Sequence, residues 1–108
     1  MKNQLKKELS KVRDFEEPRI SLEQYMTPPA LAADVVFTAY MQEDIEGKKV
    51  ADLGTGTGIL AIGAALAGAE KVKAYEKDEE ALSQAKENAE KLGMEEFIEF
   101  READIEEV

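Results

Sequence analysis

Residues 49–58 read Lys-Val-Ala-Asp-Leu-Gly-Thr-Gly-Thr-Gly, a short apolar stretch that runs into a glycine at every second position. The part Lys49–Leu53 predicts a β-strand, because short apolar stretches bounded by glycine are typical of strands. Glycine adopts backbone conformations that other residues avoid, so the repeated glycines predict a tight turn. The small apolar residues that follow predict a helix over Ile59–Ala67. This pattern is typical of the beginning of an α/β unit.

Further elements follow along the chain, with apolar residues at alternating or helical spacing: strand Lys71–Tyr75, helix Glu79–Leu92 and strand Phe97–Glu102. Gly68 and Gly93 stand where the two helices end, which is the usual place of a capping glycine. Alternating strands and helices predict parallel strands that are joined by right-handed crossovers.

Two helices are predicted before this core. Apolar residues at helical spacing predict an amphipathic helix over Lys2–Arg13. Thr27 and Pro28 predict the N-cap and first turn of a second helix that reaches about Met41. This second helix is apolar nearly all round, so we expect it to be well buried. The prediction is therefore a single small α/β domain, with N-terminal helices in residues 1–46 and a β-α-β-α-β core in residues 47–108.

The composition excludes several kinds of chemistry. The 108 residues include neither Cys nor His, so we predict no disulfide, no metal site and no catalysis by a thiolate or an imidazole. The net charge of −10 opposes contact with phosphate backbones, and only residues 1–13 are basic, with five basic side chains against one acidic side chain. A polar N-terminus and the lack of a bilayer-length apolar run predict a cytoplasmic protein without membrane contact.

Carboxylates follow each of the predicted strands, at the end where open α/β sheets bind ligands. Asp52 closes the first strand, Glu76 ends the second, and Asp104 follows the third. Glu76 lies 22 residues after Gly54, which is near the spacing of about 20 residues at which a carboxylate meets a ribose diol. Asp104 can accept a hydrogen bond from an adenine amino group. Together with the turn, these acids predict a nucleoside-binding site.

Two classes of nucleoside cofactor are considered. The nicotinamide fingerprint Gly-x-Gly-x-x-Gly fails from Gly54, because Ile59 takes the third glycine position. A shifted match that uses Ala61 starts one step late in the turn. The alternative pattern, Asp-Leu-Gly-x-Gly-x-Gly, places Asp52 directly before the turn. This extra carboxylate suits a ligand with an ammonium and a sulfonium better than a pyrophosphate, and it favours S-adenosylmethionine.

Residues 52–58, Asp-Leu-Gly-Thr-Gly-Thr-Gly, resemble motif I of class I S-adenosylmethionine-dependent methyltransferases. Residues 22–29, Leu-Glu-Gln-Tyr-Met-Thr-Pro-Pro, resemble the Leu-Glu-Gln-Tyr-Pro-Thr-x-Pro segment of the methyltransferase-like family that modifies N6 of an adenine in small-subunit ribosomal RNA. Met26 replaces the family's Pro. Val50–Gly54 and Asp78–Leu82 are similar to the same family, so the resemblance covers almost the whole chain.

The resemblance implies half of a Rossmann-like class I methyltransferase fold, with parallel strands in the order 3-2-1. It implies S-adenosyl-L-methionine as cofactor and S-adenosyl-L-homocysteine as product. It assigns no catalytic residue. Cofactor binding is assigned to the residues that match the family's contacts: Gln24, Thr27, Asp52, Gly54, Thr55, Gly56, Thr57, Gly58, Ile59, Glu76, Asp104 and Ile105.

The sequence departs from the family mainly because it lacks the motif that holds the target base. Family members continue to a fourth strand and an Asn-Pro-Pro-Phe or Asn-Pro-Pro-Tyr motif that holds the target base, whereas no Asn precedes a Pro here. We therefore expect the cofactor-binding portion of an RNA (adenine-N6) methyltransferase, a truncated domain that has no catalytic activity by itself. An RNA substrate is implied only for the full-length family.

Partners and alternatives follow from the same resemblance. A small zinc-binding activator subunit, common in the family, is one candidate partner. The exposed edge of the first strand predicts self-association, in a homodimer that covers this edge or exchanges a helix. The alternative functions are a non-enzymatic half-Rossmann module, natural or designed, and a fragment that binds NAD.

Overall fold

The computed structural model describes residues 1–13 and 26–104. Its centre is a sheet of three parallel strands, β1 (Lys49–Leu53), β2 (Lys71–Glu76) and β3 (Ile98–Glu102), in the order β1-β2-β3. The register pairs Ala51 with Lys73 and Ala74 with Phe100. The predicted parallel sheet with neighbouring strands 3-2-1 is therefore confirmed.

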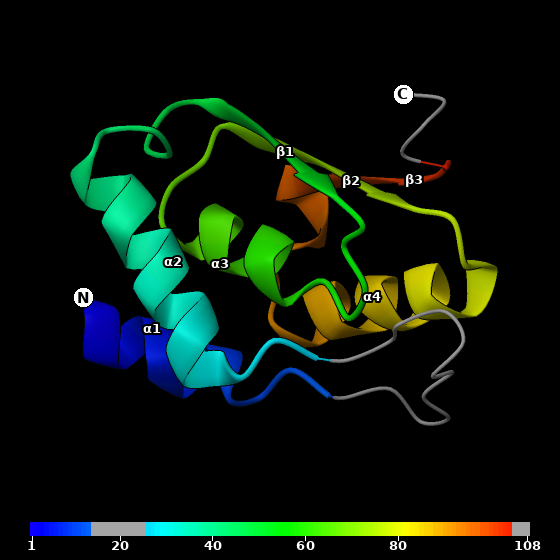
Figure 1. The fold of residues 1–108 in the computed structure, drawn as a ribbon, viewed down its shortest axis with the longest axis horizontal. Coiled ribbons are helices and arrows are strands. Elements are labelled where there is room, and N and C mark those ends of the chain that lie inside the picture. The colour runs from blue at the N-terminus through cyan, green and yellow to red at the C-terminus, as the bar shows by residue number, and fades with distance from the viewer. Residues whose placement is uncertain (14–25, 105–108) are drawn as a thin grey trace.

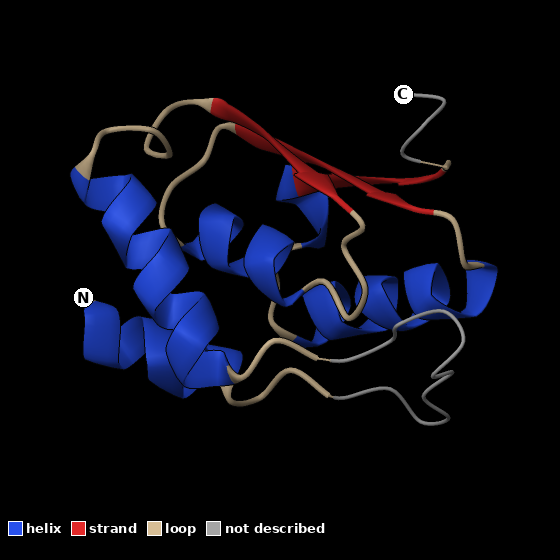
Figure 2. Cartoon of the chain, viewed as in Figure 1, coloured by secondary structure: helices blue, strands red, loops and turns tan. Residues whose placement is uncertain are grey.

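The helices lie on one side of this sheet (Figure 2). Both crossovers run in the same direction across the sheet, and right-handed crossovers of that kind place their helices on the same face. The opposite face carries exposed side chains from all the strands, which include Ala51, Leu53, Lys73 and Arg101. The helical elements are α1 (Lys2–Leu9), α2 (Pro29–Met41), α3 (Ile59–Leu66), α4 (Glu79–Lys91) and the 3-10 turn η2 (Glu95–Phe97).

Several predicted element boundaries shift. Three C-terminal ends move by a single residue, since α3 ends at Leu66, β2 at Glu76 and α4 at Lys91. The predicted helix over Lys2–Arg13 ends at Leu9, where the Ser10 hydroxyl donates to the Lys6 carbonyl at 2.8 Å and the chain enters a turn. Pro28, not Thr27, is the N-cap of α2, without a side-chain capping bond. The third strand begins at Ile98, because the residues before it form η2.

The prediction that the second helix is well buried is wrong for one of its faces. Helix α2 buries Ala32, Ala33 and Val36, but Leu31 and Val35 remain 53% and 49% exposed. The reason is that α2 packs mainly against α1 and α3 (Figure 1). Its outer face therefore remains open although its side chains are apolar.

Helix α3 is the element on which α1 and α2 pack. Gly63 allows the close approach of α1 and α2, because a Cβ at this position would lie 2.9 Å from Val36 Cγ2 and 3.4 Å from Leu9 Cδ1. On the sheet side, Ile62 and Val72 are fully buried. This packing holds the N-terminus of α3, and therefore the turn that precedes it, at the end of β1.

No helix within residues 1–13 and 26–104 combines the length and the apolar character that crossing a membrane requires.

Candidate functional site

The glycine turn between β1 and α3 has the left-handed backbone that the sequence predicts. The φ angles of Gly54, Gly56 and Gly58 are 75°, 55° and 84°, a region that favours glycine. The backbone N–H groups of Gly54 and Thr55 both donate to the Tyr75 carbonyl at 2.9 Å. The turn is therefore fixed against the end of β2, beside the next predicted site residue.

Glu76 joins the turn to the loop that follows β2. Its Oε1 accepts from the Gly56 N–H and its Oε2 from the Asp78 N–H, both at 3.0 Å. Each carboxylate oxygen has a second lone pair, so Glu76 keeps acceptor capacity for ligand hydroxyl groups. The acid predicted from spacing and the glycine turn thus lie together in the structure.

Asp52 is the second carboxylate of this cluster. Its Oδ2 accepts from the Thr55 hydroxyl at 2.7 Å. Burial raises the pKa of the Asp52 carboxyl above its ordinary value of 3.8, hydrogen bonds from Thr55 and the Ala61 backbone oppose this rise, and the charge of Glu76 adds to it. A half-buried carboxylate beside another carboxylate favours a cation over an anion as its ligand.

The other predicted site residues lie around this cluster. Thr57 is 2% exposed, and its hydroxyl oxygen has no hydrogen-bond partner among the described residues. The Ala103 N–H donates to the Glu76 carbonyl at 3.0 Å, which places the half-buried Asp104 next to the end of β2. Thr27 is half-buried before α2, apart from this network. Ile59 is buried at the start of α3; Gln24 and Ile105 lie outside the described residues.

The sequence-based prediction did not include Asn88. This residue is 3% exposed, and its Nδ2 donates to the carbonyls of Thr57 and Arg13, both at 3.0 Å. Its position in the sequence nevertheless indicates a buried polar side chain. It falls at helical spacing among Ala81, Ala85 and Leu92, so it is a polar residue on the buried side of α4.

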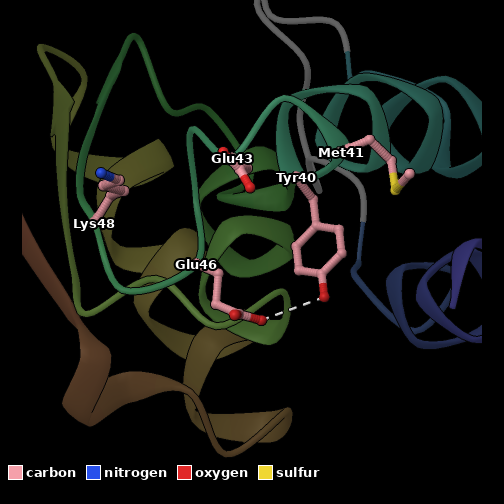
Figure 3. Close-up of a pocket in the computed structure, with 5 residues that line it drawn as sticks. All are labelled: Tyr40, Met41, Glu43, Glu46 and Lys48. Atoms are coloured by element: carbon pink, nitrogen blue, oxygen red, sulfur yellow. Dashed lines mark hydrogen bonds between the residues drawn. The ribbon is translucent and has the colours of Figure 1, made fainter.

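An open hollow of about 440 Å³ lies at the opposite end of β1, and the glycine turn is not part of it. Figure 3 shows Tyr40, Met41, Glu43, Glu46 and Lys48 around this hollow, with the Tyr40 hydroxyl 3.2 Å from Glu46 Oε2. It lies before the first residue of β1, whereas ligands of open α/β sheets bind at the carboxyl ends of the strands. Within the described part of the chain, no group of three or more acidic side chains is arranged to hold a metal ion.

Parallel strands, a left-handed glycine turn after the first strand and a carboxylate at the end of the second define a Rossmann-like α/β domain. Residues 32–107 match the family profile described as ribosomal protein L11 methyltransferase (PrmA). The chain belongs to this methyltransferase family.

Relatives of this chain include RNA-modifying enzymes. It is 44% identical over 85 residues to the rRNA N(6)-adenosine-methyltransferase METTL5 of Danio rerio, which corresponds to 78% of this chain and 41% of that protein. It superposes on PH1948 of Pyrococcus horikoshii, which carries an RNA-methyltransferase assignment, with a TM-score of 0.92 and 41% identity, over 99% of this chain and 53% of the other.

A third similar structure contains a ligand. An RNA methyltransferase from Salinibacter ruber in complex with S-adenosyl-L-homocysteine has a TM-score of 0.63 and 29% identity, over 69% of this chain and 50% of the other. The chain spans about half the length of these relatives.

Gly58 and Gly93 allow a matched test of the turn, because both have positive φ angles, of 84° and 72°. A Cβ at Gly58 would lie 3.1 Å from Ala85 Cβ, whereas a Cβ at Gly93 would meet nothing within 4 Å. Gly93→Ala should cost about 1 kcal/mol of backbone strain. Gly58→Ala should cost a further ~1–3 kcal/mol of overpacking. Denaturant unfolding measures both values, and equal losses would contradict a close contact between the turn and α4.

Asp52→Asn tests the buried carboxylate. Because the folded-state pKa is raised, the ionised carboxylate destabilises the fold at neutral pH, and this cost disappears as the pH falls through the raised pKa. The amide removes the charge but still accepts from Thr55. We therefore expect a higher melting temperature at pH 7 and a gain that fades in acid, whereas Asp44→Asn, at an exposed acid, should change little. A lower melting temperature of Asp52→Asn at neutral pH would contradict a destabilising charge at this position.

Proposed function

We propose that this chain is the S-adenosylmethionine-binding portion of an RNA (adenine-N6) methyltransferase. The observation that carries the proposal is the pair of carboxylates at the glycine turn, with Glu76 bonded to Gly56 and Asp52 half-buried beside it. Family membership supports methyl transfer, and the METTL5 relatives support an adenine in ribosomal RNA as the target. We expect such an enzyme in the cytoplasm.

Each residue of the cluster fits one part of the cofactor. The buried charge of Asp52 suits the ammonium and the positively charged sulfonium region, and the remaining lone pairs of Glu76 suit the ribose diol. Asp104 would accept from the adenine amino group, and Gln24 and Thr27 complete the set by family resemblance. When bound, the cofactor supplies an electrophilic methyl group, so the task of these residues is to position it.

The electrostatics of the cluster disfavour the alternative of NAD. A pyrophosphate at the glycine turn would lie near the carboxylates of Asp52 and Glu76, which repel it. The sequence has no Asn-Pro-Pro motif of the kind that holds the target base in the resembled family, so we propose cofactor binding for these residues and assign no catalytic residue. A non-enzymatic module would have the same fold without affinity for the cofactor.

We also propose that two copies of the chain pair along β1. The outer edge of β1 has no partner strand within the described residues, and Leu53 is 49% exposed at its end. An open strand edge offers unpaired backbone groups to a second chain. A small zinc-binding activator that pairs with the same edge is the alternative occupant.

Calorimetry with S-adenosylhomocysteine tests cofactor binding. Glu76→Ala removes the ribose acceptor and the acceptor of the Gly56 N–H in the turn, so we expect affinity to fall by about 1–3 kcal/mol, or roughly 5- to 150-fold. Glu79→Ala, an equal charge change at an exposed site, is the control and should bind normally. NADH is the comparison ligand. No binding by the wild-type chain at millimolar S-adenosylhomocysteine would refute the proposal.

Light scattering at high micromolar concentration tests self-association, and we expect the mass of a dimer. Ala51→Glu places a charge on the open edge, and Lys73 lies opposite it in the register, so the monomer should tolerate the change. The variant should have a monomeric mass and a cooperative melt whose midpoint does not depend on protein concentration. A monomeric wild-type chain would contradict pairing through β1, and a mixed complex with a zinc-binding protein would assign the edge to that partner.

A further inference from the structure

Asn88 joins two segments that are far apart in the sequence. Its Nδ2 donates to the carbonyls of Arg13 and Thr57 at 3.0 Å, and its Oδ1 accepts from the Arg13 N–H at 3.0 Å. These bonds use both hydrogens of the amide and one of its lone pairs. A side chain that is 3% exposed and bonded in this way has few alternative orientations.

The bond to Thr57 acts directly on the glycine turn. The peptide unit between Thr57 and Gly58 is held on both sides, because its carbonyl accepts from Asn88 and its N–H donates to the Thr55 carbonyl at 2.8 Å. One turn of α4 earlier, Ala85 packs against Gly58, where an added Cβ would lie only 3.1 Å away. Helix α4 therefore supports the turn by a hydrogen bond and by a packing contact.

The bonds to Arg13 hold the end of the described N-terminal residues against α4. Arg13 directly precedes residues 14–25, which include the predicted cofactor ligand Gln24. Gln84 adds a second donor to the Arg13 carbonyl, at 2.9 Å. The same surface of α4 thus holds the glycine turn and Arg13.

We propose that Asn88 is a positioning residue for the cofactor site, an inference that rests on the proposed function. Its amide orients the Thr57–Gly58 peptide and ties Arg13 to the same point of α4. The free protein then presents the turn in its binding conformation, and less ordering is required when the ligand binds. No smaller side chain reaches both backbones, and a carboxylate cannot donate to either carbonyl.

Asn88→Ala is the main test, with Leu82→Ala as the control, since Leu82 is equally buried in α4 but has no hydrogen bond to the turn. S-adenosylhomocysteine affinity is measured well below the melting temperature of each variant. We expect binding about tenfold weaker for Asn88→Ala. Leu82→Ala should lower the melting temperature and leave the affinity within twofold of wild type.

Amide hydrogen exchange in the ligand-free protein gives a readout that does not depend on the cofactor. Asn88→Ala should increase exchange at Gly58, and Leu82→Ala should leave it unchanged relative to the rest of α3. Gln84→Ala removes one bond to Arg13 and leaves the bond to Thr57, so it should not alter exchange at Gly58. If Asn88→Ala does not fold, Asn88→Asp, which keeps the size of the side chain, takes its place in both measurements.

Asn88→Asp adds a test by pH. Its carboxylate keeps the bond from the Arg13 N–H but faces the carbonyls of Arg13 and Thr57, so affinity at neutral pH should be low. As the pH falls, the introduced carboxyl becomes protonated and donates one hydrogen bond, so affinity relative to wild type should recover. A constant ratio to wild type across pH would contradict positioning through Thr57.

The outcomes separate the two proposals. Normal affinity and normal exchange in Asn88→Ala would overturn the positioning role and leave the proposed function intact. Absence of binding by the wild-type chain would overturn the proposed function, and the exchange rates would still decide whether Asn88 holds the turn.

Discussion

The left-handed backbone of the glycine turn is the constraint on which the site depends. Three of five consecutive residues between β1 and α3 have positive φ angles, and the last of them lies against α4. A side chain at Gly58 would press on Ala85, so the turn and the packing of α4 cannot change independently. Since Tyr75, Glu76 and Asn88 all bond to this turn, its conformation sets the relative positions of the strand ends.

The same turn explains why a carboxylate is kept in an unfavourable place. Burial raises the pKa of Asp52, which means that the folded protein carries its negative charge at a cost. The Thr55 hydroxyl offsets part of this cost by donating at 2.7 Å. Groups with perturbed pKa values concentrate at functional sites, and a cationic ligand would remove the penalty that the free protein retains. Removal of the charge of Asp52 is therefore expected to increase the stability of the fold and to decrease the affinity for a cationic ligand.

Much of the fold was predictable because its signals are local. The bounds of β1 and the start of α4 agree with the prediction, since alternation and capping depend on neighbouring residues. The site was predictable as far as the glycines and Glu76, whose spacing follows from the length of one β-α-β unit. The open face of α2 was not, because composition does not tell how many neighbours a helix has. Asn88 was missed because its partners lie 31 and 75 residues away in the sequence.

The distribution of charge favours one activity of the proposed enzyme, cofactor binding, over the other, RNA binding. A net charge of −10 repels the RNA backbone, and the basic N-terminal segment is partly neutralised, since Lys2 pairs with Asp34 at 2.8 Å and Lys11 with Glu8 at 3.1 Å. The acids at the glycine turn suit a cationic cofactor instead. An acidic chain of this kind disfavours contacts with phosphate groups. The negative charges that attract a cationic cofactor are thus opposite in sign to the charges that RNA binding requires.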